Sequence, residues 1–225
     1  YKPVLKEAFR TFFYQRAGFA KAVPYAEAAW ADTASHIGTG QDTQARIYND
    51  KNNAATEKDL SGGWYDAGDY NKYTTWAADY VITLLHAYEE NKAAWGDDFN
   101  IPESNNGIPD ILDEVKWGLD WLIKMQNATG NNSVLSIVGL SHSKANDSHA
   151  SPPSSATGRS YYGPASTNAT MSTAAAFAFA SKVLQDIPEL ANYADDLKTR
   201  AENAWTWAVA NPNVVFFNND ESRQP

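Results

Sequence analysis

The chain has 225 residues, a mass of 24.7 kDa and a formal net charge of −9 at pH 7. With 43% hydrophobic and 20% charged residues it is not an intrinsically disordered chain, and its length fits one large domain or two small ones. The acidic balance disfavours nucleic acid and anionic membranes as partners, because phosphate contacts need Lys and Arg, and no apolar run could cross a bilayer. Cysteine is absent, which excludes disulfides, Cys-based zinc sites and thiol catalysis.

Five segments have the apolar spacing of α-helices, at positions three and four residues apart. The third begins at Pro109, a proline suited to a first helical turn. The fourth is apolar on nearly every side, which is typical of a buried helix. The five helices are expected at residues 3–16, 74–91, 109–126, 168–186 and 189–211.

The sequence has little that is typical of β-strands, and one short apolar run at 134–138 is a candidate strand. Two long connections, about 18–73 and 130–168, have no regular pattern. Connections of that length in a compact domain usually carry function. The sequence therefore predicts a scaffold of helices with functional loops gathered at one end.

One loop, residues 61–73, is dense in chemically useful side chains. Asp66 and Asp69 lie three residues apart, with three glycines in the loop and aromatic residues on both sides. Two neighbouring carboxylates can position and activate one water, and hydrolysis of a glycosidic bond needs such a group with a protonated carboxyl opposite. The alternative is an Asp-rich turn that caps the helix starting near Thr74.

Aromatic residues make up 13% of the chain, with 8 Trp, 12 Tyr and 9 Phe. Most of them are expected in the core. An acidic protein with surplus Trp and Tyr also fits a sugar-binding cleft, because flat rings stack on sugar faces.

The loop resembles the catalytic aspartate signature of glycoside hydrolase family 9, the inverting cellulases; the matching residues 62–73 read GGWYDAGDYNKY. Residues 101–114, IPESNNGIPDILDE, are similar to the motif on the family's next helix, and residues 13–18 and 163–170 also look like family segments. The resemblance implies hydrolysis of β-1,4-glucosidic bonds in cellulose or a related β-glucan. It implies Asp69 as the general base and Asp66 as a residue that holds the attacking water.

The resemblance also implies an all-α fold, an (α/α)6 barrel of twelve helices. Five helices match about the first half, so we expect residues 1–225 to be a partial catalytic domain that continues beyond this chain. The family's acid, a Glu, and a His/Arg pair are expected outside it, while Glu103 and Glu114 belong to the helix motif. Two alternatives stay open: an exo-acting glucosidase or glucosaminidase of the same family, and a non-catalytic carbohydrate-binding protein.

Four residues are expected to contact substrate. His149, Tyr161 and Tyr162 lie in a region that lines the cleft in relatives, and Trp64 flanks the aspartate pair. For Trp64, packing of the loop against the helices is an equal alternative.

No cofactor is required for this chemistry. Zinc is not expected, because relatives that bind it use cysteines at the positions that match Ala17 and Ser35-His36 in this sequence. Calcium is compatible as a structural ion, with no ligands assigned. The resemblance further implies secretion, and full-length partners such as Ig-like, carbohydrate-binding or dockerin modules.

Overall fold

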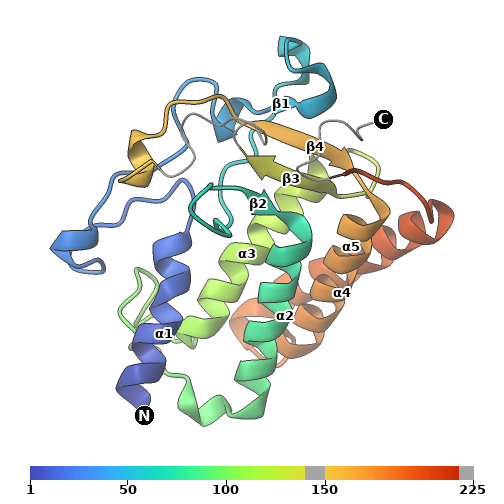
Figure 1. Ribbon diagram of the computed structural model, residues 1–225. Coiled ribbons are helices and arrows are strands. Elements are labelled where there is room, and N and C mark those ends of the chain that lie inside the picture. Colours follow the sequence, from blue (N-terminus) through green and yellow to red (C-terminus); the bar gives the residue numbers. More distant parts are fainter. Residues whose placement is uncertain (140–149, 218–225) are drawn as a thin grey trace.

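The computed structural model describes residues 1–139 and 150–217 (Figure 1). All five predicted helices are confirmed, with bounds within two residues of those expected. They are α1 (Lys2–Gln15), α2 (Thr74–Glu90), α3 (Asp110–Asn127), α4 (Thr167–Leu184) and α5 (Ala191–Ala210). No helix of the described residues is long and apolar enough to cross a membrane.

The helices pack side by side around one apolar core. α2 lies between α3 and α4, α5 packs along α4, and α1 contacts α3. Leu85, Leu119 and Phe177 are fully buried where these helices meet. α4 is less enclosed than its sequence predicts, because Met171 is 43% exposed and Ala175 and Ala178 also face solvent.

The expectation of an all-α fold is confirmed only in part: the five helices form the body of the fold, but the chain also forms a four-stranded sheet. The strands are β1 (Arg46–Ile47), β2 (Lys72–Tyr73), β3 (Leu135–Gly139) and β4 (Tyr161–Ala165), in the order β1-β4-β3-β2. β3 is antiparallel to β2 and β4, whereas β1 is parallel to β4. Of these four strands, the sequence predicts only β3, from the apolar run at 134–138. β1 and β2 are two residues long, too short for a period, and Gly163-Pro164 within β4 are residues that usually break strands.

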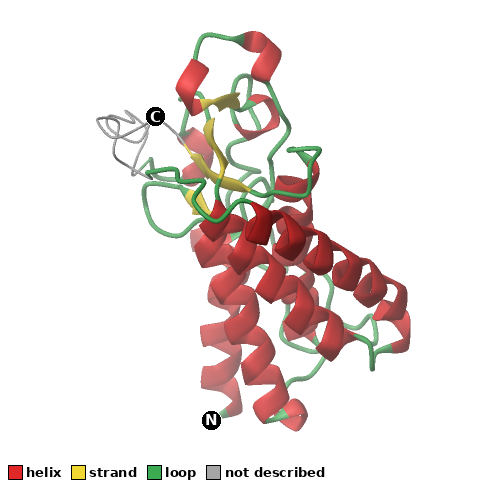
Figure 2. Cartoon of the chain, turned by 90° about the vertical axis from the view of Figure 1, so that its right-hand side faces the viewer, coloured by secondary structure: helices red, strands yellow, loops and turns green. Residues whose placement is uncertain are grey.

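The sheet and the long connections gather at one end of the helices (Figures 1 and 2). The connection from α1 to β2 carries four short 3₁₀ helices, at Ala28–Trp30, Asp42–Gln44, Tyr48–Asp50 and Ala54–Thr56. β2 leads directly into α2. The aspartate loop therefore lies where the sheet meets the helix ends.

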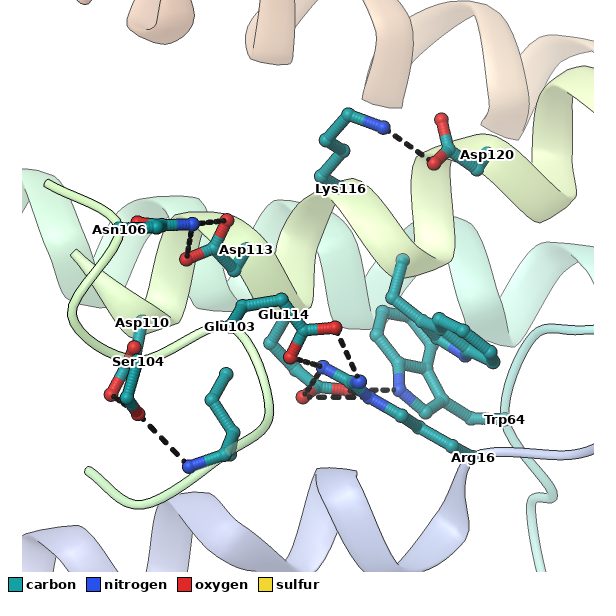
Figure 3. Close-up of polar contacts among 12 residues, drawn as sticks. Arg16, Trp64, Glu103, Ser104, Asn106, Asp110, Asp113, Glu114, Lys116 and Asp120 are labelled. Atoms are coloured by element: carbon teal, nitrogen blue, oxygen red, sulfur yellow. Dashed lines mark hydrogen bonds and ion pairs between the residues drawn. The ribbon is translucent and has the colours of Figure 1, made fainter. Parts of the chain in front are cut away.

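A buried arginine joins the four segments around that loop (Figure 3). Arg16, at the end of α1, is fully buried, and its Nη2 lies 2.8 Å from Oε2 of the buried Glu114 on α3. Its Nη1 lies 2.9 Å from Oε1 of Glu103, in the connection that precedes α3. Glu114 Oε1 also accepts a hydrogen bond of 2.7 Å from Trp64 Nε1 in the loop. Charged hydrogen bonds in a buried setting are costly to leave unmade, so these segments must assemble together.

Backbone pairing strengthens the same junction. Ala17 N–H donates to Gly63 O at 2.8 Å, and Tyr65 N–H donates to Gln15 O at 3.0 Å. The start of the loop is thus held against the end of α1 before the chain reaches its aspartates.

We expect Arg16→Met to lower the free energy of unfolding by about 3–5 kcal/mol, because Glu114 would be left as a buried, unpaired charge. Urea denaturation at neutral pH measures the loss. Lys116→Met is the control: its Nζ lies 2.6 Å from Asp120 Oδ2 at the surface, and such a pair contributes less than about 1 kcal/mol. Equal losses for the two variants would contradict the central role of Arg16.

Candidate active site

The aspartate loop is shaped by glycines and by one internal backbone bond. Gly63 has φ 74°, and a Cβ there would lie 2.7 Å from the Trp121 ring, so only glycine lets the loop approach α3 this closely. Beyond it, Asp66 N–H donates to Asn71 O at 3.0 Å. This bond closes residues 66–71 into a compact loop and places both carboxyl groups on it, each half-buried.

The two aspartates differ in their surroundings. Burial, and secondly the negative charge of Asp69, raise the pKa of Asp66 to about 6, although the Ala67 N–H partly stabilises the ionised form. Asp66 Oδ1 is buried and accepts no hydrogen bond from the described residues. The Asp69 carboxylate accepts a hydrogen bond of 2.8 Å at Oδ2 from the Asn71 amide. Such a pair can bind a water between two acceptors and remove its proton.

Two hollows adjoin residues 65–70, the part of the loop that carries the aspartates. The smaller, of about 190 Å³, is lined by Asp66 and Gln15 with Tyr80 of α2. The larger, of about 550 Å³, shares Gln15 with it and is lined by Ala67 and Gly68 of the loop. The loop therefore stands between two concave surfaces, as a group that acts on a bound ligand should.

The wall of the larger hollow combines an exposed indole with polar groups. Trp30 lines it and is 68% exposed, which is unusual for so large an apolar side chain. Tyr70, also on this wall, donates a hydrogen bond from its hydroxyl to Ala150 O, and Asp32 accepts one of 3.0 Å from Ser154 N–H. These bonds attach residues 150–155 to the loop side of the hollow.

The structure favours the packing alternative for Trp64 over substrate contact. Trp64 is 3% exposed, its ring lies edge-on to Phe12 at a centroid distance of 5.6 Å, and its Nε1 is bonded to Glu114. A Cβ on Gly118 of α3 would overlap the indole, so the helix provides a slot for it. Trp64 borders the smaller hollow, but almost none of its surface is accessible to a sugar.

Tyr162 is likewise misplaced for substrate contact, because it is 3% exposed, packs in the main core and donates from its hydroxyl to Thr56 O at 2.9 Å. Tyr161 points to the other face of the sheet, where it packs on a small apolar cluster that includes Ile137, and it is not among the residues that line the two hollows. His149 lies outside the described residues.

The place where zinc-binding relatives were expected to carry ligands is filled by hydrogen bonds. His36 Nδ1 lies 2.5 Å from the Tyr65 hydroxyl, and Ser35 Oγ lies 2.7 Å from the same oxygen. Asp42 pairs with the buried Lys72 at 2.7 Å. Burial and the charge of Asp42 raise the pKa of Tyr65, which therefore stays neutral. Within residues 1–139 and 150–217, no group of three His, Asp or Glu side chains is arranged to hold a metal ion.

Sequence reasoning missed Trp30 and Asn71. Trp30 lies in a long connection without periodicity, so no pattern in the sequence predicts that its side chain is exposed. Asn71 follows Asp69 by two residues, a spacing at which an amide can reach a carboxylate.

The family model of glycosyl hydrolase family 9 matches residues 1–225. The chain belongs to glycosyl hydrolase family 9. It is 33% identical to a cellulose 1,4-beta-cellobiosidase of Acetivibrio thermocellus over 95% of this chain and 26% of that protein. A cellodextrinase of Butyrivibrio fibrisolvens is 31% identical over 99% of this chain and 38% of that protein.

Solved structures of family 9 agree with these relatives. A metagenome-derived glycoside hydrolase family 9 endoglucanase superposes with a TM-score of 0.80 at 30% identity, over 100% of this chain and 39% of that one. The chain thus spans about a quarter to two fifths of the length of these family members.

We expect Asp66→Asn to stabilise the protein at pH 8, by on the order of 1 kcal/mol after allowance for partial exposure, and to leave its stability at pH 4 unchanged. The folded-state pKa of about 6 lies above the ordinary value of 3.8, so the stability that protonated Asp66 contributes is full below about pH 4 and is lost as pH rises through 6. Thermal unfolding at the two pH values measures the difference. The exposed Asp195→Asn on α5 is the control, with no such pH-dependent gain.

Proposed function

We propose that the protein containing this chain hydrolyses β-1,4-glucosidic bonds in cellulose or a related β-glucan, with inversion at the anomeric carbon. The observation that carries the proposal is the pairing of Asp66 with Asp69 on a rigid loop, in a chain of family 9. The names of the relatives, a cellobiosidase and a cellodextrinase, support the substrate class.

In the proposed reaction, a water binds between the two carboxylates. Asp69 accepts its proton while the water oxygen forms a bond to the anomeric carbon, and the Asp66 carboxylate accepts a second hydrogen bond that holds the water in line. The glycosidic C–O bond breaks as a carboxylic acid on the opposite side protonates the leaving oxygen. Below about pH 6 Asp66 becomes protonated and donates instead of accepting, so activity should decline toward acid pH.

The acid is proposed to come from a part of the protein beyond this chain. Glu103 and Glu114 are unsuited to the role, because both are committed to the buried Arg16 guanidinium. Carboxylate oxygens that are bonded to a guanidinium cannot also reach a glycosidic oxygen, as those of a general acid must.

Trp30 is proposed to bind a glucosyl unit beside the loop. Its exposed ring lines the same hollow as Ala67 and Gly68, and aromatic faces are suited to stacking on sugars. Tyr161 remains a weaker candidate, and His149 stays a prediction.

The rest of an (α/α)6 catalytic domain is proposed to cover the exposed apolar side of α4 and α5. Met171, Trp205 and Val209 are 43%, 55% and 62% exposed, and large exposed apolar groups of this kind usually mark an interaction surface. The share of the relatives that this chain spans supports the same proposal. Secretion, further modules, a structural calcium and the absence of any required cofactor remain parts of the proposal.

Two other functions are distinguishable by experiment. An exo-acting family 9 glucosidase or glucosaminidase would release single sugars from chain ends, whereas an endoglucanase shortens long chains rapidly. A non-catalytic carbohydrate-binding protein would keep its biological role when the aspartates are replaced.

We expect Asp69→Asn in the full-length protein to lower kcat on soluble β-glucan by about 10²–10⁴-fold, because the general base is lost. Asp66→Ala should cost nearly as much, since both act on one water. Reducing-sugar release measures turnover, and calorimetry with cello-oligosaccharides should detect unchanged binding by Asp69→Asn. Retention of more than about a tenth of wild-type turnover would refute the assignment.

The first product released from a β-linked glucan should be the α-anomer, because water attacks from the face opposite the leaving oxygen. Inverting enzymes hold their two carboxyl groups roughly 6.5–9.5 Å apart to admit that water. Proton NMR within the first turnovers, before mutarotation, identifies the anomer. An initial β-anomer would point to a retaining mechanism instead.

A further inference from the structure

We infer that Asn71 is a positioning residue that aims the Asp69 carboxylate and holds the Asp66 backbone in the same turn. This inference rests on the proposed function, in which Asp69 is the general base. Asn71 is 5% exposed, its Nδ2 donates to Asp69 Oδ2 at 2.8 Å, and its carbonyl oxygen accepts the Asp66 N–H at 3.0 Å. Asn71 therefore contacts both acidic residues: Asp69 through its side chain and Asp66 through its backbone.

Asn71 is itself held by the sheet. It directly precedes β2, whose Lys72 pairs with Val138 of β3. A Cβ on Gly139, the next residue of β3, would overlap Asn71 Oδ1 and lie 2.9 Å from its Cγ. The amide thus lies flat against the β3 backbone, in space that only glycine leaves open. The position of the amide is set by a strand and not by the loop alone.

The hydrogen-bond partners decide which end of the amide faces Asp69. With Oδ1 on the Gly139 side, both Nδ2 hydrogens have acceptors: Asp69 Oδ2 at 2.8 Å and the Tyr73 hydroxyl at 3.4 Å. The reverse orientation would set the amide oxygen against a carboxylate oxygen, two acceptors in contact. Asn71 therefore acts as a donor to Asp69.

A donor on Oδ2 matters for a general base because it fixes the plane of the carboxylate. Oδ1 receives only a long bond of 3.5 Å from the Asn71 N–H, so it is the oxygen presented to water. A small misplacement at this point costs rate rather than substrate affinity. Asn71 would thus support catalysis without touching the sugar.

The test uses the full-length protein with Asn71→Leu, which keeps the size but removes the donor, and Asn71→Asp, which replaces the donor by a negative charge. We expect kcat to fall roughly 10- to 100-fold with KM changed by less than about twofold. Asn71→Ala serves in place of the leucine variant if that one fails to fold.

Asn53→Leu is the matched control. It breaks a hydrogen bond of the same kind and length, Asn53 Nδ2 to Asp50 Oδ2 at 2.8 Å, in an exposed turn remote from the hollows. Its kcat should equal that of the wild type.

The outcomes separate this inference from the proposed function. If Asp69→Asn is inactive but a folded Asn71 variant keeps wild-type kcat, with only a lower melting temperature, Asn71 is structural and the inference falls. If the wild type does not hydrolyse β-glucans, or Asp69→Asn remains active, the proposed function falls first. A loss of kcat with a steady KM in a folded variant supports the positioning role.

Discussion

The position of the aspartate loop depends on one buried cation. Arg16 lies between Glu114, which is fully buried, and Glu103, and the first of these also receives the Trp64 indole N–H. None of these groups can be left unpaired without a large desolvation cost, so α1, α3, the connection before α3 and the loop are stable only together. The loop is fixed at its base, so its tip can carry a carboxyl group, Asp66, whose ionised form is disfavoured.

Asp66, at the tip of the loop, destabilises the folded protein when it is ionised. Partial burial and a neighbouring negative charge disfavour ionised Asp66, so its pKa rises to about 6. A folded protein tolerates such a group where the surrounding structure is already determined, here by the glycine contacts on Trp121 and by the Asn71 bonds. Stability is given up at Asp66, which we propose acts on the attacking water, and it is recovered in the apolar core and the arginine junction.

Much of this arrangement could be predicted from sequence, because helices and loops leave local patterns. The 3.6-residue spacing located all five helices, and the motif at 62–73 located the aspartates. What could not be predicted depends on contacts distant in sequence. Trp64 is buried because Gly118, 54 residues later on α3, leaves a slot, and Asn71 reaches its position because Gly139 has no side chain. β1 and β2 exist only through their partners, since two residues have no period of their own.

The inverting reaction that we propose would separate the catalytic roles along the polypeptide. In such a reaction, water and acid must approach the sugar from opposite faces, with a substrate between them. Asp66 and Asp69 would act on the water side, and since Glu103 and Glu114 are bound to Arg16, the proton donor is proposed to stand on an element opposite them. The closed ring of helices proposed for the whole domain would bring such an element opposite the first half without any need for it to be near in sequence. The exposed apolar residues of α4 and α5 are where that ring would continue, and the same contacts that complete the core would then set the distance between base and acid.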